Sequence, residues 1–338
     1  MIDNVILPST TREEWPLIRQ TIVGRITESF GRPGRPRPAG KAAYQELARY
    51  EKHGLLHIHL RYHVIGDEWN EGICVVPPGV SAVNPAPAVL TCHGSNGSLG
   101  KQGMLDPENL PDRAYAIELA RRGYVTFSVD QYGFGPALEQ AAGAEELARK
   151  FYQSHPDWSL TGRHLFGHQR ALDVLEQLEI VKGPPFGVMG HSLGGYAALC
   201  LTALDERIAA GVASAGVSPN LYNVYRGITS GRLAEPQFAA AVQQKRGRMP
   251  WEKQEMIALC APRAFLMIEP YNDPYNPYIL PTCACLEKAA AVYQLLGVPE
   301  RIAALIHGDG HTTIASVREQ AYCWFDRFLA AKAQADSE

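Results

Sequence analysis

The sequence predicts an α/β fold with a mostly parallel sheet that is covered on both faces by helices. The first observation is that short apolar runs, bounded by turn residues, recur along the chain, as buried parallel strands require. The second is that amphipathic segments with helical periodicity separate these runs. The third is a glycine-rich turn after the run at 186–189, which leads directly into an Ala- and Leu-rich segment typical of a helix.

The N-terminal residues 1–53 are predicted to form a helical extension, and residues 54–338 the main domain. A helix at 13–30 follows from the spacing of Trp15, Ile18, Ile22, Ile26 and Phe30, and a second helix is expected at 41–53. Between the two lies a segment dense in Pro, Gly and Arg, which predicts an irregular linker.

The main domain is predicted to begin with two paired strands and to continue as alternating strands and helices. Polar and apolar residues alternate at 55–65, and the run at 72–77 is the expected partner strand. Two insertions, at about 131–160 and 218–253, are expected to act as cap elements. The further strands are expected at 88–92, 124–129, 187–190, 208–214, 264–269 and 302–306, and the further helices at 111–122, 162–180 and 313–331.

Composition indicates a globular protein that has no reason to bind nucleic acid or an anionic membrane surface. Apolar residues make up 46% of the 338 residues, and the formal net charge is -3. The N-terminus lacks the pattern of a signal peptide, and no apolar run is long enough to span a bilayer. The seven cysteines lie mostly in apolar segments, which favours reduced thiols and a cytoplasmic location. Cys283 and Cys285 have no second pair nearby, so no metal site is expected.

Ser192 is the candidate nucleophile. It lies at the centre of Gly190-His191-Ser192-Leu193-Gly194, a G-x-S-x-G pattern between a predicted strand and a predicted helix. Glycines at both ends of the pattern remove the Cβ atoms that so sharp a turn would crowd. The alternative interpretation is a glycine-rich turn in which the serine only caps the helix.

His311 is the candidate general base. A serine hydroxyl needs a base that accepts its proton, and such groups gather at the carboxyl ends of the strands in open α/β sheets. His311 follows the last predicted strand in a loop with flanking glycine. His307 lies within that strand or at its end, where packing is the more natural role. His191 is expected to point away from the site.

Asp273 is the candidate orienting acid, and Glu269 is the alternative. Asp273 lies in the loop four residues past the end of the strand at 264–269, whereas Glu269 is at the strand terminus itself. The resulting chain order, Ser192, Asp273, His311, is the order in which this type of fold carries its triad.

The oxyanion donors are expected to be backbone N–H groups on two loops. One is the N–H of Leu193, at the start of the helix after the turn. The other comes from the loop His93-Gly94-Ser95-Asn96-Gly97, where Ser95 is preferred and Asn96 is second. The candidate substrate-binding side chains, chosen from the segments that follow predicted strands, are Asn96, Tyr132, Trp251 and Tyr271.

From about residue 85 to residue 331, the chain resembles the α/β-hydrolase superfamily, in particular its dienelactone-hydrolase-like and acetyl-xylan-esterase-like branch. The resemblance rests on the triad and on HGSNG, LARRGYVTFSVDQYGFG, QRALDVLEQL, GHSLGG, ALDERIAAGVASAG and ALCAPRAFLMIEPYNDP. It implies the α/β-hydrolase fold and serine-hydrolase chemistry. One departure is that dienelactone hydrolases have a cysteine where this chain has Ser192, which favours ester hydrolysis.

The function expected from these residues is hydrolysis of a carboxylic ester through an acyl-enzyme, without a metal or an organic cofactor. The resemblance implies a small or short-acyl ester as the partner molecule. The same triad would also serve a C–C bond hydrolase or a peptidase. A third alternative is a binding protein that keeps the fold without turnover. The sequence leaves open whether the chain forms a homo-oligomer.

Overall fold

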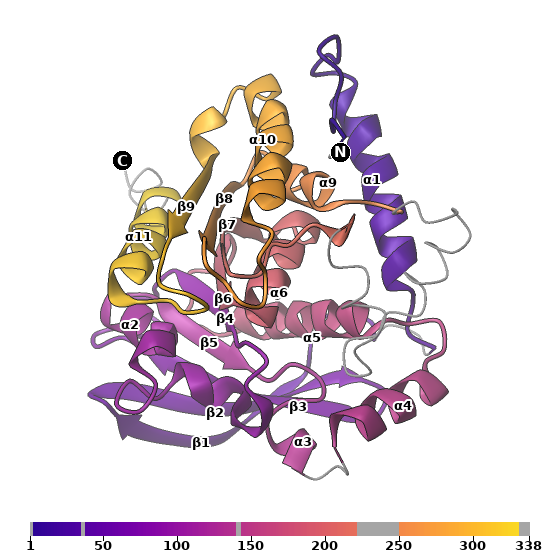
Figure 1. The fold of residues 1–338 in the computed structure, drawn as a ribbon. Helices are drawn as coiled ribbons and strands as arrows, with labels where there is room; N and C mark the ends of the chain where they lie inside the picture. Colours follow the sequence, from indigo (N-terminus) through magenta and orange to yellow (C-terminus); the bar gives the residue numbers. More distant parts are fainter. Residues whose placement is uncertain (1–2, 35–37, 140–142, 222–249, 331–338) are drawn as a thin grey trace.

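The computed structural model describes residues 3–34, 38–139, 143–221 and 250–330. These residues contain one nine-stranded sheet with the order β1-β2-β3-β5-β4-β6-β7-β8-β9 (Figure 1). Strands β1, β2, β3 and β5 pair in antiparallel fashion, and every pair from β5 through β4 to β9 is parallel. The strands are β1 Tyr44–Lys52, β2 Leu55–Ile65, β3 Glu68–Val76, β4 Ala88–Cys92, β5 Val125–Val129, β6 Phe186–His191, β7 Ile208–Ser214, β8 Ala264–Pro270 and β9 Ile302–His307.

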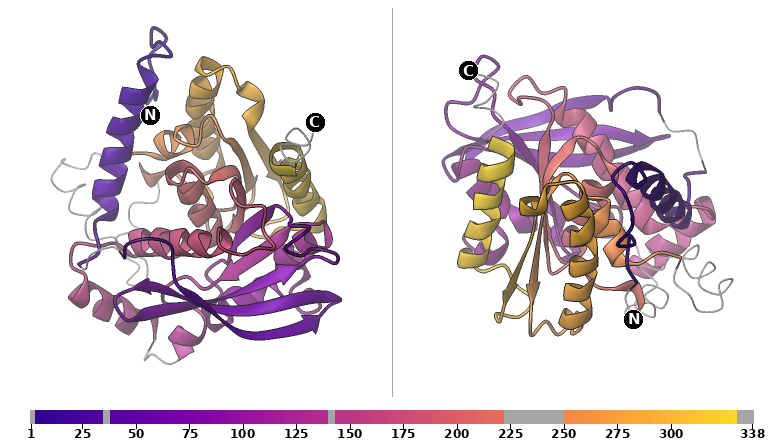
Figure 2. Two further views of the ribbon diagram at one scale, coloured as in Figure 1. Left: turned by 180° about the vertical axis from the view of Figure 1, so that it is seen from behind. Right: turned by 90° about the horizontal axis from the view of Figure 1, so that it is seen from above.

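Helices cover both faces of the sheet, as predicted. Helices α2 (Tyr115–Arg121) and α11 (Ala315–Phe325) pack on one face. The other face carries α5, α6, α9 and α10, with α1 outside them, so that α11 and α1 lie on opposite sides of the strands (Figure 2). The other helices are α1 Trp15–Phe30, α3 Pro136–Glu139, α4 Ala144–Ser154, α5 Leu160–Leu175, α6 Leu193–Leu204, α9 Lys253–Ala258 and α10 Ile279–Leu295. Short helical turns are η1 Gly97–Met104, η2 Pro111–Arg113, η3 Pro299–Arg301 and η4 Asp326–Ala330.

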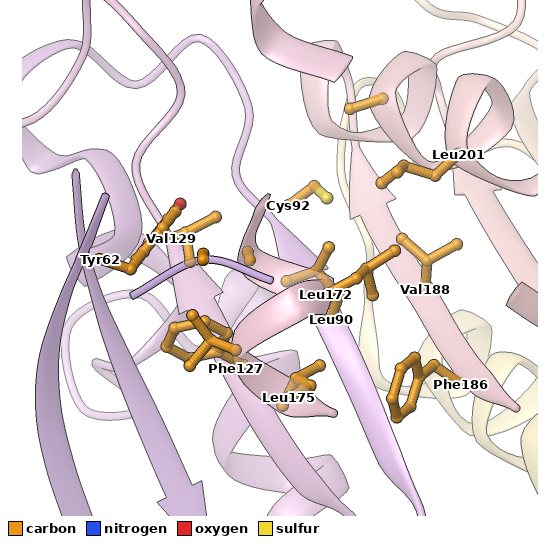
Figure 3. Close-up of a cluster of buried hydrophobic side chains, with 14 of the residues drawn as sticks. Tyr62, Leu90, Cys92, Phe127, Val129, Leu172, Leu175, Phe186, Val188 and Leu201 are labelled. Atoms are coloured by element: carbon orange, nitrogen blue, oxygen red, sulfur yellow. The ribbon is translucent and has the colours of Figure 1, made fainter. Parts of the chain in front are cut away.

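The centre of the sheet is fixed by apolar packing against α5 and α6 (Figure 3). Leu90 of β4 and Val188 of β6 are fully buried, and so are Leu172 of α5 and Leu201 of α6. Burying one side chain of this size stabilises the fold by about 1.5–3 kcal/mol. Strand β4 is the point at which the strand order reverses, because β5 lies on one side of it and β6 on the other. Ligand sites of open α/β sheets form beside such a point, at the carboxyl ends of the strands.

The predicted helix at 13–30 is confirmed, and it is joined to the main domain. Phe30 packs edge-on against Trp251, whose indole Nε1 donates to Ser29 Oγ at 2.7 Å. The Phe30 carbonyl also accepts hydrogen bonds from the backbone N and the side chain of Ser159, the N-cap of α5. The extension therefore contacts both α5 and the segment that precedes α9.

The predicted helix at 41–53 is wrong, because these residues form the edge strand β1. Ala, Gln, Glu, Leu and Lys favour a helix locally, but pairing with β2 supplies the backbone with hydrogen bonds along the sheet. Almost all of β1 is exposed on both faces, so the segment has no apolar alternation by which its sequence could reveal a strand. The boundary expected at residues 53 and 54 thus separates two strands of one sheet.

The structure describes most of the first predicted insertion and only the two ends of the second. The first, at about 131–160, contains α3 and α4. Most of the second, residues 222–249, lies outside the described residues, and its two ends are at Leu221 and Pro250. Across the described part of the chain, no helix combines the length and the apolar character needed to cross a bilayer.

Candidate active site

Ser192 lies at a sharp turn between β6 and α6, with φ 59° and ψ -120°. Neighbouring backbone leaves no room for side chains at either end of the turn. A Cβ on Gly190 would lie 2.2 Å from the Gly194 carbonyl oxygen, and a Cβ on Gly194 would lie 2.0 Å from that of Cys92. The Ser192 N–H donates to the Ser214 carbonyl on β7 at 2.8 Å. The G-x-S-x-G pattern is therefore a steric requirement of this turn, and it presents the serine at the carboxyl end of β6.

Asp273 and His311 are brought together from the loops after β8 and β9. His311 Nδ1 lies 2.7 Å from Asp273 Oδ2, and the Asp273 side chain is fully buried. The other carboxylate oxygen accepts the backbone N–H groups of Tyr275 and Asn276, at 2.7 and 3.2 Å. With the carboxylate ionised, the proton of a neutral His311 is on Nδ1, which leaves Nε2 as the nitrogen that can accept a proton.

His191 packs against His311, contrary to the prediction that it points away from the site. The two ring centroids are 4.6 Å apart, and His191 Nδ1 lies 3.1 Å from Ser214 Oγ. Burial lowers the pKa of His191 to about 3, so this neighbour is neutral when His311 gains a proton. Because His191 directly precedes Ser192, the contact places the His311 ring beside the elbow.

Ser192 itself makes no hydrogen bond to His311 among the described residues. Such bonds are often long or misaligned without substrate and tighten in the complex. Tyr275 completes the surroundings of the base, with its ring edge-on to His311 at a centroid distance of 4.8 Å. The loop of His311 is also held by Gly310, whose N–H donates to Asn272 Oδ1 at 2.9 Å.

Glu269, the alternative acid, has a different set of partners. Its Oε1 accepts the N–H groups of Gly216 and Val217, at 3.1 and 2.8 Å, and its Oε2 accepts the side-chain amide of Asn276 at 3.4 Å. Burial raises the pKa of Glu269 to about 8, and the nearby Asp273 adds to that shift. Glu269 therefore joins the loops after β7 and β8, whereas Asp273 contacts the imidazole.

The loop after β4 lies directly against the elbow. A Cβ on Gly94 would lie 3.2 Å from the His191 carbonyl oxygen and 3.4 Å from Ser192 Cβ, so this loop packs closely on the elbow. The N–H of Leu193, in the first turn of α6, has no acceptor within its own helix. Both backbone segments expected to bind an oxyanion therefore flank Ser192.

Two interactions hold the loop after β4 in place. Lys101 and Asp130 form a buried ion pair with 2.5 Å between Nζ and Oδ2, and the Lys101 N–H donates to Asp130 Oδ1 at 2.7 Å. His93 and Gln131 exchange two further bonds. The Gln131 N–H donates to His93 Nε2 at 2.9 Å, and the Gln131 side-chain amide donates to the His93 carbonyl at 2.5 Å. Neither residue pair was expected from the sequence, since each joins segments about 30 to 40 positions apart.

A small cavity of about 10 Å³, which has room for about one water molecule, lies beside the elbow, between α5 and α6. Most of its walls are apolar. The residues that line it are Gln131, Thr161, His164, Leu165, Leu193, Tyr196, Ala197 and Cys200.

The four predicted substrate-binding residues lie in different parts of the molecule. Trp251 is buried and packs on α1, and Tyr271 is 64% exposed. Tyr132 is half-buried and packs against Phe151. Asn96 donates through its amide to the Gly100 carbonyl at 2.8 Å and so shapes the loop after β4. None of these four contributes to the cavity beside the elbow.

Metal-ligating side chains are not grouped in the described residues. No cluster of three or more His, Cys, Asp or Glu side chains there has the geometry to hold a metal ion.

A serine on a strained strand-to-helix turn, in a sheet that is parallel around that turn, is the arrangement of the α/β-hydrolase fold, and this chain has that fold. The His–Asp pair at the ends of the following strands adds the remaining groups of a hydrolytic triad.

A sequence profile described as "Glucuronyl esterase, fungi" matches residues 122–297, just over half of the chain. The chain belongs to this glucuronyl esterase family. Members of the family are serine carboxylic-ester hydrolases with a Ser-His-Asp triad.

Solved structures agree with this assignment at the level of the fold. A glucuronoyl esterase from Solibacter usitatus has a TM-score of 0.75 and 17% identity, over 96% of each chain. A structure from Bacteroides fragilis NCTC 9343, described as a "putative acetyl xylan esterase", has a TM-score of 0.70 and 17% identity, over 89% of this chain and 77% of that one. The similarity to acetyl-xylan esterases is thus confirmed at the level of the fold, and the similarity to dienelactone hydrolases stays a prediction.

A sequence relative covers only part of the chain. "Putative hydrolase YtaP" of Bacillus subtilis (strain 168) is 29% identical over 127 residues, which is 37% of this chain and 41% of that protein. The match therefore spans less than half of the relative's length.

Proposed function

We propose that this chain hydrolyses carboxylic esters, with Ser192 as the nucleophile, His311 as the general base and Asp273 as the group that orients it. The observation that carries the proposal is the 2.7 Å contact between Asp273 and His311 next to the strained Ser192 turn. A carboxylate that holds Nδ1–H fixes the tautomer in which Nε2 can accept the serine proton.

In the proposed reaction, Ser192 Oγ attacks the ester carbonyl carbon while His311 Nε2 takes the hydroxyl proton. The carbonyl π electrons move to its oxygen, which the N–H groups of Leu193 and Ser95 then bind. When the intermediate collapses, the bond to the alcohol oxygen breaks and His311 gives that oxygen its proton. A water molecule, deprotonated by the same nitrogen, then cleaves the acyl-enzyme, and the serine regains its proton.

Asp273 and His191 have distinct parts in this sequence. The Asp273 carboxylate stabilises the imidazolium that forms twice in each cycle. His191 touches the same ring and stays neutral, so it does not oppose the charge on His311. A second cation at that position would disfavour each proton transfer to the base.

The proposed substrate is an ester whose acyl part is a glucuronyl group or a similar small hydroxylated acid. Membership of the glucuronyl esterase family supports this choice. The second candidate is an ester of a short, unsubstituted acid, which the apolar side chains of Leu165, Leu193 and Ala197 in the cavity would favour.

The nucleophile is tested by the intact mass of wild type and Ser192→Ala after treatment with a fluorophosphonate. One adduct on wild type and none on the variant is expected. An unlabelled wild type, together with no turnover of any ester, would contradict the hydrolase proposal.

The substrate is tested by the hydrolysis of methyl glucuronate and of 4-nitrophenyl acetate, butyrate and octanoate. The proposal expects the glucuronate ester to have the highest kcat/KM after correction for the leaving group. A preference for butyrate or acetate would instead favour the second candidate.

A further inference from the structure

The side-chain amide of Gln131 has a fixed orientation beside the nucleophile. Its nitrogen faces the His93 carbonyl oxygen at 2.5 Å. A carbonyl only accepts hydrogen bonds, so the amide –NH₂ has to face it and the amide oxygen has to face the other way. The opposite assignment would place two acceptors in contact.

His93 is in turn held by Gln131 through a second bond. His93 Nε2 accepts the Gln131 backbone N–H at 2.9 Å, so the ring proton is on Nδ1, which lies 2.7 Å from the Gly94 carbonyl. Because both bonds act on Gln131, neither its backbone nor its side chain is free to rotate. The amide oxygen therefore keeps its direction when a ligand enters.

That oxygen has no hydrogen-bond partner among the described residues, although Gln131 is only 2% exposed. A buried acceptor without a donor costs free energy, and proteins leave few such atoms. Gln131 also lines the cavity between α5 and α6, together with Leu193, the residue after the nucleophile. Gln131, whose amide oxygen lacks a donor, thus lines a small cavity beside the elbow that has room for one hydroxyl group.

The position of the cavity indicates which part of an ester it would receive. The alcohol oxygen has to lie next to His311 Nε2 to receive its proton. The residues that line the cavity come from α5, α6 and the start of the loop after β5, and Ser192, His311 and Asp273 are not among them. The cavity thus lies on the side of the Leu193 N–H, where the acyl part of the substrate remains after the alcohol has left.

From these observations we infer that Gln131 is a specificity-determining residue whose Oε1 accepts a hydrogen bond from a hydroxyl group on the acyl part of the substrate. The inference rests on the ester hydrolysis proposed above. It makes hydroxylated acids the preferred acyl groups, because an unsubstituted acyl chain leaves the Gln131 oxygen without a donor.

The test compares methyl glucuronate with its 2-deoxy, 3-deoxy and 4-deoxy analogues on wild type and on Gln131→Met. Methionine has a similar length and offers no amide oxygen. For one analogue, loss of the hydroxyl should lower the kcat/KM of wild type by about tenfold or more. The same loss should change the kcat/KM of Gln131→Met by less than about twofold, because the acceptor is already gone.

Lys101→Met is the matched control for a looser loop. It removes the ion pair with Asp130 in the loop that His93 also belongs to, and leaves the Gln131 oxygen in place. This variant should slow all the esters by a common factor and keep the sensitivity of wild type to the deoxy analogue. A purely structural role of Gln131 would give that same pattern in Gln131→Met, and would overturn the inference.

The outcomes also separate this inference from the proposed function. If wild type hydrolyses all four glucuronate esters equally well, Gln131 does not recognise a hydroxyl group of the acyl part. The esterase proposal would stand. If wild type hydrolyses only 4-nitrophenyl esters, the pair 4-nitrophenyl 3-hydroxybutyrate and butyrate replaces the sugar series, and equal rates reject the inference. If no ester is hydrolysed, both proposals fail.

Discussion

The Ser192 elbow and the His311 loop meet at one edge of the sheet, but they are held in place by different means. At the elbow, two backbone segments are in close contact. A Cβ on Gly194 would lie 2.0 Å from the Cys92 carbonyl oxygen. In the His311 loop, a Cβ on Gly308 would meet nothing within 4 Å. That loop depends on side-chain hydrogen bonds instead: the Gly310 N–H donates to Asn272 Oδ1, and His311 Nδ1 donates to Asp273 Oδ2. The nucleophile is thus placed by sterics and the base by polar contacts.

The largest expected effect is a loss of kcat when the contact between Asp273 and His311 is changed. Asp273→Asn should lower kcat by about 10⁴-fold, because an amide can donate to Nδ1 and stabilise the tautomer whose Nε2 cannot accept the serine proton. The backbone N–H groups of Tyr275 and Asn276 would keep an oxygen acceptor, so the unfolding free energy should change little. Steady-state kinetics and urea denaturation measure the two quantities.

Glu269→Gln is the matched control for that variant, since it changes a carboxylate of the same region that does not contact His311. It should keep most of the activity. The opposite ranking of the two variants would make Glu269 the triad acid.

The next effect is expected at the elbow. Gly194→Ala should lower the free energy of unfolding by more than about 4 kcal/mol or prevent folding, because the new methyl group meets rigid backbone. Gly308→Ala should change the same quantity by less than about 0.5 kcal/mol. Urea denaturation of both variants compares the two regions directly, and similar stability would contradict the steric account of the elbow.

A smaller effect should appear in the pH dependence of stability. The pKa of Glu269 is raised to about 8 in the folded state, so the folded chain binds a proton that the unfolded chain releases near pH 4.5. This contribution is fully present below about pH 4.5 and is lost as the pH rises towards 8, at up to about 1.4 kcal/mol per pH unit. We therefore expect the unfolding free energy of Glu269→Gln to fall less steeply between pH 5.5 and 7.5 than that of wild type. Parallel curves for variant and wild type would mean that Glu269 is ionised in both states.

The smallest effect is expected from a single polar contact in the His311 loop. Asn272→Ala removes the acceptor of the Gly310 N–H. A hydrogen bond of this kind contributes only about 1 kcal/mol, because it replaces a hydrogen bond to water. We therefore expect kcat to fall about fivefold while KM stays near its wild-type value. An unchanged kcat would show that the Asp273 contact alone positions the base.

The elbow was predictable from the sequence because its requirements are local. Gly190 and Gly194 are needed within a few residues of Ser192, so their spacing is visible in a single stretch. Asp273 and His311 were predictable for another reason, namely that each follows a strand end and that the chain order of triads restricts the choice. The contact between His191 and His311 had no such signal, because it depends on how two rings pack between β6 and the loop after β9.

The strand β1 and the Gln131 amide show what the sequence could not reveal. The residues of β1 favour a helix locally, and only β2, at the other end of a hairpin, makes them a strand. The orientation of the Gln131 amide depends on one carbonyl oxygen 38 positions earlier in the chain. Both features follow from contacts between distant residues, which leave no periodicity or spacing in the sequence.

The order of the strands also has a consequence for the chain during its synthesis. Ser192 leaves the ribosome before His311 does, because His311 comes 119 positions later in the chain. Synthesis proceeds at about 5–20 residues per second, so His311 is made roughly 6–24 s after Ser192. Over that interval β6 can already pair with β4, but the serine has no partner to activate it. A nascent chain of this protein is therefore not expected to hydrolyse esters until the loop after its last strand has been translated.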